Sequence, residues 1–276
     1  MIFHRIFSYS ILILCTALAF CACSDDSYEN GNNPTKKYLP KSISLEGEIT
    51  SSITTYDYDN SHRLTSIVKK EIYIPGNTWN ELSFDISYDA SGKISQVVKT
   101  TRSISNKRTD SQDSDILSFA YRELEVEIAD GNYKNILLLN GAKQVIEMKR
   151  FTSDNLLRST EKYQYDNNGN ISGYSLSNGS EDSGDNYTFS YDKGKGIFKD
   201  VNIPQWFFIA ILSENNNIAN NLNKQVLTSP NGQTNTQMIL YKYNKDGYPV
   251  SETFYYEGYS LAVAAPSTSI EYQIAD

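Results

Sequence analysis

The sequence is poor in cysteine, histidine and methionine, and this poverty excludes several classes of protein. Its 276 residues include three cysteines, two histidines and three methionines, and all three cysteines lie within the first 23 residues. The body of the chain therefore cannot build a zinc framework, a haem or iron–sulfur centre, or a disulfide-stapled module. A Ser-His-acid triad needs a histidine, and the body offers only His62, in a predicted turn beside Arg63. We predict no metal and no cofactor.

Basic residues are also scarce. Lys and Arg number 25 against 33 Asp and Glu, which gives a net charge of −8. Such a chain repels phosphate, so a nucleic-acid partner is disfavoured. Aromatic residues, in contrast, are abundant, with 21 Tyr, 11 Phe and 2 Trp. Set among Ser, Thr, Asn and Asp, they favour β-sheet over helix.

Residues 1–22 have the pattern of a secretory signal. A short start with one positive charge precedes a run, residues 6–22, that is almost wholly apolar. The end of this run resembles the lipobox at which bacterial lipoproteins are acylated and cut. The bulky Phe20 precedes Cys21, whereas the small Ala22 precedes Cys23. We therefore predict cleavage before Cys23 and lipid attachment to it, with an ordinary cleaved signal or an uncleaved anchor as the alternative.

Residues 23–40 are predicted to form a flexible, acidic and polar linker. Their Asp, Asn, Gly and Pro residues leave too few apolar side chains to offset the entropy of ordering. The acidic residues directly after Cys23 resemble the surface-export signal of Bacteroidetes lipoproteins. Together with the lipobox, this resemblance implies a protein that is lipid-anchored to the outer membrane and exposed at the cell surface, because several acyl chains tether a protein firmly.

Residues 41–276 read as a single all-β domain. Apolar and polar residues alternate along successive runs, as at Phe84, Ile86 and Tyr88, and this period of two buries one face of a strand. Turn clusters such as residues 75–77 and 130–132 separate the runs. No parallel β-α-β rhythm is present in the sequence. We predict a twisted antiparallel meander.

One short unit recurs along the domain. It consists of an aromatic or apolar residue, any residue, Tyr, Asp, two polar residues, usually Gly, one more residue, and then Ile or Leu. The Asp side chain caps a tight turn, the Gly accepts a positive φ, and the Tyr and the Ile or Leu meet across the strand pair. His62 and Lys195 take the glycine position in two copies. The copies are Tyr56–Leu64, Ile86–Ile94 and Tyr163–Ile171, with looser forms at Phe189–Ile197 and Tyr241–Pro249.

This unit resembles the YD repeats of RHS-type proteins, in which tandem hairpins form a long, coiling antiparallel sheet. Over residues 41–276 the chain is similar to short Bacteroidetes lipoproteins with a YD-like domain of unknown function, including a late Asp-Gly-Tyr-Pro hairpin at residues 246–249. The copies are not tandem here, and the upstream glycine of true YD repeats is missing. The resemblance implies an open, barrel-like curled sheet and supplies no catalytic residues.

One apolar run breaks the strand rhythm. It begins with Pro204, which suits the first turn of a helix, and continues almost wholly apolar to residue 213. We predict a short helix over about 204–213. Because it is apolar all round, it should be buried against the concave side of the sheet, with Trp206 in a structural role. A membrane-dipping or partner-binding element is the alternative.

Acidic residues gather at three places that could suggest calcium. A calcium loop puts Gly sixth and a carboxylate twelfth, whereas the run that starts at Asp166 has Gly fourth and Ser177 twelfth. We interpret this run as turn capping. The acidic stretches 110–115 and 181–185 are predicted to be solvated loops, so no metal site is expected.

Catalysis would require paired carboxylates. Strand acids such as Glu125, Glu127 and Glu147 are candidates for a glycan-processing hydrolase, which would show an acid pair about 5 to 9.5 Å apart in a cleft. On alternating strands such side chains more often point to water. We therefore predict no catalytic residues and keep the hydrolase as the rival hypothesis.

Exposed aromatic residues are the candidate ligand contacts. Trp79 lies in a predicted loop, and Tyr255, Tyr256 and Tyr259 flank the predicted turn at residues 257–258. Flat rings with a polar edge suit stacking on sugars or packing against protein. We predict a non-enzymatic binding or structural role toward a glycan or an envelope protein at the outer surface. A scaffold subunit would instead show a contiguous exposed apolar patch.

Overall fold

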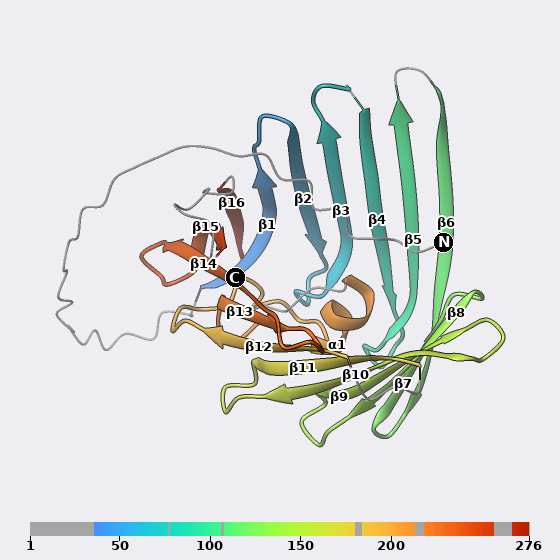
Figure 1. Cartoon of the computed structure of the whole chain (residues 1–276). Coiled ribbons are helices and arrows are strands. Elements are labelled where there is room, and N and C mark those ends of the chain that lie inside the picture. The colour runs from blue at the N-terminus through green and yellow to red at the C-terminus, as the bar shows by residue number, and fades with distance from the viewer. Residues whose placement is uncertain are drawn as a thin grey trace.

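The chain folds into a closed barrel of antiparallel strands (Figure 1). The computed structural model describes residues 36–76, 78–105, 108–179, 184–212, 218–256 and 267–275, without the side chains of residues 105, 108–110 and 256. These residues form sixteen strands and one short helical segment. The predicted all-β antiparallel meander is confirmed.

The strands follow one another around the barrel in chain order, and each pairs with the next. The first eight are β1 (Lys37–Leu45), β2 (Thr50–Tyr58), β3 (Leu64–Tyr73), β4 (Thr78–Tyr88), β5 (Ile94–Ser105), β6 (Arg108–Arg122), β7 (Glu125–Ala129) and β8 (Tyr133–Leu139). The others are β9 (Val145–Thr152), β10 (Leu157–Tyr165), β11 (Ile171–Asn178), β12 (Asp185–Tyr191), β13 (Leu222–Thr228), β14 (Thr234–Tyr243), β15 (Pro249–Tyr256) and β16 (Thr268–Ala275).

The first and last strands complete the ring. β1 pairs with β2 on one side and with β16 on the other, in a register that runs from Lys37↔Ala275 to Leu45↔Thr268. The prediction of an open sheet is therefore wrong. Closure pairs the backbone groups that an open sheet would leave free at its two edges. β1 begins at Lys37, inside the predicted linker 23–40, so the last residues of that range belong to the barrel wall.

The wall is uneven in height. β5 and β6 have 12 and 15 residues, whereas β7 and β8 have 5 and 7. Figure 1 shows β2–β6 as a tall wall beside the lower β7–β13. The predicted acidic loop 110–115 lies within β6, because this strand extends far beyond its shorter neighbour β7.

The repeated turns share one end of the barrel, because they follow even-numbered strands. In the first, Asp59 Oδ1 accepts hydrogen bonds from the backbone N–H groups of Ser61 at 2.8 Å and Arg63 at 3.0 Å. The fourth residue of the turn has positive φ, 59° at His62 and 80° at Gly92, as the predicted glycine position requires. The turns built in this way are 59–63, 89–93, 140–144, 166–170 and 244–248.

Seven tyrosine hydroxyls form a ring of staples beside these turns. Each donates to a backbone carbonyl of the preceding strand at 2.7–2.9 Å. This carbonyl lies beyond the last pair of residues that the backbone ladder joins between the two strands. The donors and acceptors are Tyr58 to Pro40, Tyr88 to Leu64, Tyr121 to Ile94, Tyr165 to Val145, Tyr191 to Ile171, Tyr241 to Leu222 and Tyr272 to Pro249. The staples therefore join neighbouring hairpins at seven of the eight junctions around this end, all but the one between β7 and β8.

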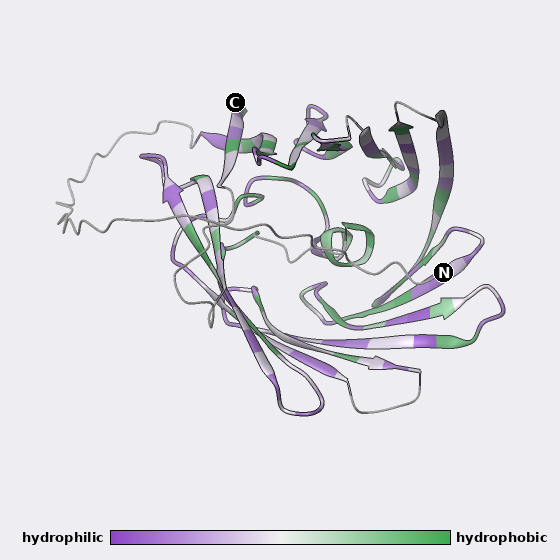
Figure 2. Cartoon of the chain, turned by 45° about the horizontal axis from the view of Figure 1, so that its top comes forward, coloured by the Kyte–Doolittle hydropathy of each residue, from purple (hydrophilic) through white to green (hydrophobic). Residues whose placement is uncertain are grey.

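The predicted helix is present and lies inside the barrel. It consists of α1 (Gln205–Phe207) and the π-helical η1 (Phe208–Leu212), directly after Pro204. Figure 2 shows it as a hydrophobic coil within the ring of strands. Phe207 and Phe208 are fully buried, and Trp206 is 3% exposed. The expected structural role of Trp206 is thus confirmed.

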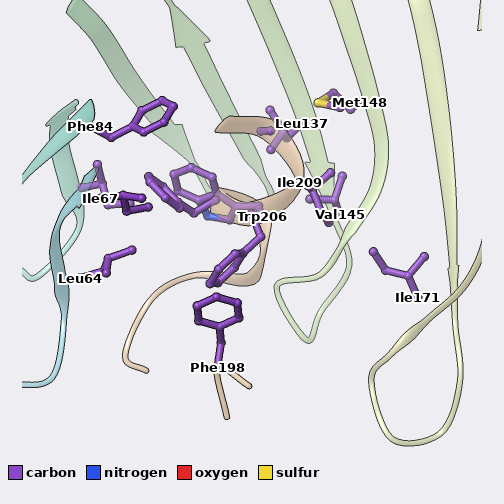
Figure 3. Close-up of a cluster of buried hydrophobic side chains, with 14 of the residues drawn as sticks. Leu64, Ile67, Phe84, Leu137, Val145, Met148, Ile171, Phe198, Trp206 and Ile209 are labelled. Atoms are coloured by element: carbon purple, nitrogen blue, oxygen red, sulfur yellow. The ribbon is translucent and has the colours of Figure 1, made fainter. Parts of the chain in front are cut away.

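The core surrounds this helix at the end of the barrel that carries the repeated turns. Inward side chains from opposite parts of the barrel wall converge on Trp206 and Ile209 (Figure 3). Trp206 lies 5.8 Å from the ring of Phe119, and Phe198 lies 4.7 Å from Phe208, measured between ring centroids. The wall contributes Leu64, Ile67, Phe84, Leu137, Val145, Met148 and Ile171.

The outer face of the wall is mainly polar. On β4, the buried Phe84 and Ile86 alternate with Ser83, Asp85 and Ser87, which point outward. Ser, Thr, Lys, Gln and Glu dominate the outward positions of the other strands, with a minority of apolar residues such as Ile116 and Leu240 between them. Among the described residues, no helix has the length and apolar character needed to cross a membrane.

Candidate functional site: a plugged barrel with an open polar half

The segment that enters the barrel is held on one side by the first repeated turn. We call residues 192–212, between β12 and the end of the helix, the plug. The backbone N–H of Asn202 donates to His62 O at 2.9 Å, and its side-chain amide donates to Ser61 O at 3.2 Å. Phe198 packs against Tyr56 on β2 with ring centroids 5.5 Å apart. These contacts fix the plug to the β2–β3 hairpin.

The opposite side of the plug is held by the β10–β11 hairpin. Gln205 Nε2 donates to Gly169 O at 3.1 Å. Just after the helix, Asn220 and Asn170 exchange hydrogen bonds, since each side-chain oxygen accepts from the other residue at 3.1 Å. Asn170 is buried, so this exchange satisfies amide groups that have lost water. The plug is therefore tied across the full width of the barrel.

A third set of contacts joins the plug to the closing strands. Asp200 Oδ2 accepts from the backbone N–H of Tyr38 at 2.8 Å and from the hydroxyl of Tyr248 at 2.5 Å. The rings of Tyr38 and Tyr248 stack with centroids 4.6 Å apart, and the Tyr38 hydroxyl donates to Asp246. Burial and the hydrogen bond to Asp200 raise the pKa of Tyr248. The plug thus also fastens β1 to the β14–β15 turn.

The other half of the barrel has polar inward positions. Beyond the buried Ile67, the inward positions of β3 are Lys69, Glu71 and Tyr73, and Tyr73 is 49% exposed. Lys69 Nζ lies 3.0 Å from Glu71 Oε1, and the two side chains are 41% and 50% exposed. We call the inward residues above the core the open half. Its charged and aromatic members include Lys69, Glu71, Tyr73, Lys99, Asp113, Asp115, Tyr133, Arg150, Glu161 and Tyr187.

A row of aromatic rings borders the open half on the low side of the wall. Tyr174 stacks on Tyr163 at 5.5 Å and on Tyr187 at 4.5 Å, from three neighbouring strands. Beside this row, Arg150 Nε donates to Glu161 Oε1 at 3.0 Å, and the Tyr163 hydroxyl donates to the same carboxylate. Burial and the nearby Glu161 charge raise the pKa of Tyr163. The row presents ring edges and hydroxyls, because the faces cover one another.

A separate pocket of about 520 Å³ lies at the plugged end. It lies between the turns 59–63 and 89–93 and the start of the plug. Arg63 points its guanidinium at Asp59, with Nη2 to Oδ2 at 2.6 Å, and lies 4.4 Å from the ring centre of Tyr88. Its charge is therefore already matched, and the pocket offers mainly neutral hydrogen-bonding groups. The lining is Ser61, Arg63, Tyr88, Ser91, Gly92, Asn202, Ile203 and Pro204.

The predicted ligand-contact residues do not come together in one site. Trp79 was expected in a loop but lies in β4, facing outward between Ile72 on β3 and Ile104 on β5. The strand begins at Thr78, so the turn after β3 is shorter than its Pro and Gly suggested. Lys70 Nζ lies 5.7 Å from the Trp79 ring centre. Trp79 therefore belongs to a small apolar spot on the outer wall.

The tyrosine patch is only partly described. Tyr255 lies on β15 opposite Met238 of β14, at an outward position. Tyr256 is the last residue of the same strand, and its side chain lies outside the described part of the chain. Tyr259, the turn at 257–258 and Cys23 also lie outside the described residues. The joint patch and the lipid site therefore stay predictions.

The strand acids named as hydrolase candidates face away from the interior. Glu125 and Glu127 alternate with the buried Val126 and Ile128, and Glu147 precedes the buried Met148. Arg122 pairs with Glu125, and Lys149 Nζ lies 3.0 Å from Glu147 Oε1. Within the part of the chain that the structure describes, no group of three or more His, Cys, Asp or Glu residues could hold a metal ion.

The open half was missed in the sequence, although a signal for it exists. In the long strands, the residues that face inward are apolar along one part and charged along the next. On β3, for example, the inward positions change from Ile67 to Lys69 and Glu71. The same change occurs from Val97 to Lys99 on β5. A period-two pattern that switches character within one strand indicates a barrel whose interior is apolar at one end and polar at the other.

No protein-family model and no curated protein matches this chain. The solved structures to which this chain is similar include two porin-like proteins. A porin-like protein from Bacteroides uniformis ATCC 8492 is 10% identical, with a TM-score of 0.43, over 76% of this chain and 97% of that one. A porin-like protein from Bacteroides vulgatus ATCC 8482 is 11% identical, with a TM-score of 0.42, over 86% of this chain and 99% of that one.

Proposed function

We propose that this protein is a lipid-anchored envelope protein whose barrel binds a polar ligand, a glycan, in its open half without chemical conversion. The observation that carries the proposal is the division of the interior. The plug and its core fill one end, whereas inward side chains at the other end are polar and reach water, as Tyr133 does with 50% exposure. A barrel that is filled at one end and open to water at the other has the shape of a cup.

The plug argues against a through-channel. It is apolar, it is tied to opposite hairpins, and it fills the lumen with aromatic rings such as Trp206 and Phe208. Opening a path would expose this core to water, at a cost of about 25 cal/mol for each Å² of apolar surface. The geometry therefore suits retention of a ligand rather than its passage.

The outer face favours water over lipid around the barrel. A strand barrel that spans a membrane carries an outward apolar band about 25 Å tall between aromatic girdles. Here the outward positions of β4 include Glu81, Ser83, Asp85 and Ser87. Attachment would then come from acylation of Cys23 at the predicted lipobox, as in the Bacteroidetes lipoproteins that the sequence resembles. The proposed setting is the outer membrane, with the barrel outside the bilayer.

The chemistry of the open half suits a ligand rich in hydroxyl groups. Carboxylates, amines and tyrosine hydroxyls alternate there, as at Lys69, Glu71 and Tyr73, so donors and acceptors of both kinds are offered. The edges of Tyr174 and Tyr187 add apolar contact beside these polar groups. Sugars need this mixture. The apolar spot at Trp79 on the outer wall is better suited to a protein partner.

A pair of matched variants tests the proposal. The full-length lipoprotein is screened on a glycan array, and any glycan found is titrated against Tyr133→Ala and Tyr255→Ala. Tyr133 faces the open half and Tyr255 faces outward, while both are tyrosines on strands. We expect Tyr133→Ala to weaken binding about fivefold and Tyr255→Ala to leave it unchanged, since stacking and edge contacts of one ring contribute about 1 kcal/mol. The reverse result, or no glycan binding at all, would refute the cup.

A further inference from the structure

The two rims of the barrel differ in charge. The plugged rim consists of the repeated turns, the 123–124 turn and the loop segments on either side of the helix, and the open rim consists of the loops at the opposite ends of the strands. In the described loops of the open rim there are four acids and no Lys or Arg. These acids are Glu46, Glu48, Asp130 and Asp154.

The plugged rim is different, because its described residues carry as many bases as acids: Arg63 and six lysines against seven Asp and Glu. Six lysines there are exposed, and the ion pairs among the described residues include none of them. Several of the acids have partners: Asp59 pairs with Arg63, and Asp200 accepts from Tyr38 and Tyr248. The exposed lysines are Lys93, Lys143, Lys193, Lys195, Lys199 and Lys245.

The chain also enters the barrel at the plugged rim. β1 begins at Lys37, and its second residue, Tyr38, contacts Asp246 in the 244–248 turn. Lys36 and Lys37 are exposed and add two positive charges at this point. The stretch from Cys23 to Lys37 spans at most roughly 50 Å. A lipid on Cys23 would therefore hold the plugged rim, rather than the open rim, toward the bilayer.

We propose that the plugged rim docks on an anionic lipid surface, with the open rim directed away from it. This proposal rests on the lipid attachment of the proposed function for its tether, but the charge asymmetry is independent of it. Exposed lysines gain from phosphate headgroups within a Debye length, and the acids of the open rim are repelled by them. With Lys36 and Lys37 the plugged rim has a net charge of +2, whereas the described loops of the open rim have −4, so the plugged rim is the end that an anionic surface attracts.

The experiment places a fluorescent label at each end of one strand. β9 runs between the two rims, so Ala142→Cys labels the plugged rim and Ser153→Cys labels the open rim; both positions are exposed. The body of the chain has no cysteine after Cys23, so each new thiol is unique once Cys23 is acylated. The lipoprotein is reconstituted in vesicles of phosphatidylcholine alone or with phosphatidylglycerol, with a quencher on the lipid headgroups.

We expect strong quenching at residue 142 and weak quenching at residue 153 in phosphatidylglycerol vesicles. The difference should shrink in about 1 M salt, where the Debye length is about 3 Å. It should also shrink in the triple variant Lys193→Gln, Lys199→Gln, Lys245→Gln. The control with the same charge change is Lys70→Gln, Lys134→Gln, Lys162→Gln on the outer wall, and it should keep the difference.

Equal quenching at the two labels, stronger quenching at residue 153, or the same pattern without phosphatidylglycerol would overturn the docking proposal. A triple wall variant that abolishes the difference would overturn the assignment to the plugged rim. Whether the lipid anchor is present is tested separately. Labelling of the unsubstituted protein by a thiol reagent would show that Cys23 is not acylated. Binding of the rim to a soluble anionic glycan but not to these vesicles would also count against a lipid surface.

Discussion

The hydroxyl of Tyr88 donates to the backbone carbonyl of Leu64 at 2.7 Å, which joins two neighbouring hairpins at the point where their backbone ladder has ended. Leu64 is fully buried, so its carbonyl has little access to water. The staple therefore satisfies an acceptor that the sheet itself leaves open. The tyrosine of the repeated unit thus has two roles. It lies opposite the apolar residue of its own hairpin, and its hydroxyl binds the backbone of the preceding hairpin.

Replacement of this hydroxyl tests the staple. Tyr88→Phe should lower the free energy of unfolding by about 1–3 kcal/mol, because the Leu64 carbonyl loses its partner while the ring stays in place. Chemical denaturation of the purified protein measures the change. Tyr255→Phe removes a hydroxyl from an outward tyrosine and should be nearly neutral. Equal effects of the two substitutions would show that the Tyr88 hydrogen bond contributes nothing specific.

The staples also predict how stability depends on alkaline pH. Burial raises the pKa of Tyr88 to about 12 from its ordinary 10.0, and burial likewise raises the pKa values of Tyr58, Tyr121 and Tyr165. Between pH 10 and 12 the unfolded chain loses tyrosine protons that the folded chain keeps. The contribution of the Tyr88 staple should be complete below pH 10 and be lost as the pH rises through 12. Urea midpoints measured from pH 8 to 12 should fall, and a constant midpoint would contradict the prediction.

The two tryptophans should differ sharply in their effect on stability. Trp206→Ala empties the centre of the core and should cost about 3–5 kcal/mol. Trp79→Ala removes a ring from the outer wall and should cost clearly less, leaving the fold intact. Thermal melts of both variants, followed by circular dichroism, make the comparison. A larger loss for Trp79→Ala would mean that the outer spot, not the plug, organises the barrel.

Close backbone contact makes Gly173 hard to replace. A Cβ on Gly173 would lie 2.9 Å from Tyr187 O, so Gly173→Ala has to push β11 away from β12. A Cβ on Gly141 meets nothing within 4 Å. We expect Gly173→Ala to lower the melting temperature by several degrees, consistent with a cost of about 1–3 kcal/mol. Gly141→Ala should leave it unchanged or raise it slightly.

Lipid attachment is tested at the cysteine itself. Cys23→Ala should abolish incorporation of labelled fatty acid and release the protein from membranes, because Cys23 follows the small Ala22. Metabolic labelling and cell fractionation give the readout. Unchanged labelling in this variant, with loss in Cys21→Ala, would place the anchor at the other cysteine.

The sequence predicted those features that depend on neighbouring residues. The turn at 59–63 could be read from Asp59 and the residue that needs positive φ, and the structure has that geometry at His62. The buried helix could be predicted because residues 206–212 are apolar in every direction. Both inferences need only a few consecutive residues, so local physical chemistry suffices.

Long-range features could not be read in the same way. Closure depends on the pairing of Ser44 with Ser269, and the sequence of neither segment identifies the other as its partner. Trp79 was misplaced because Pro75 and Gly76 suggested a longer loop than the tall wall allows. The open half was missed for a related reason. Whether Lys69 points out of the barrel or into its interior depends on which alternate positions of the whole strand face inward.

Closure of the ring by its first and last strands has a consequence for biogenesis. Ser44 and Ser269 are separated by 225 positions, so β1 has no partner on one side until the end of the chain has emerged. A partial polypeptide offers two free strand edges, which are templates for aggregation. We therefore expect C-terminal truncation before β16 to yield an insoluble product, and a circular permutant that links residue 275 to residue 37 through a short connector to fold.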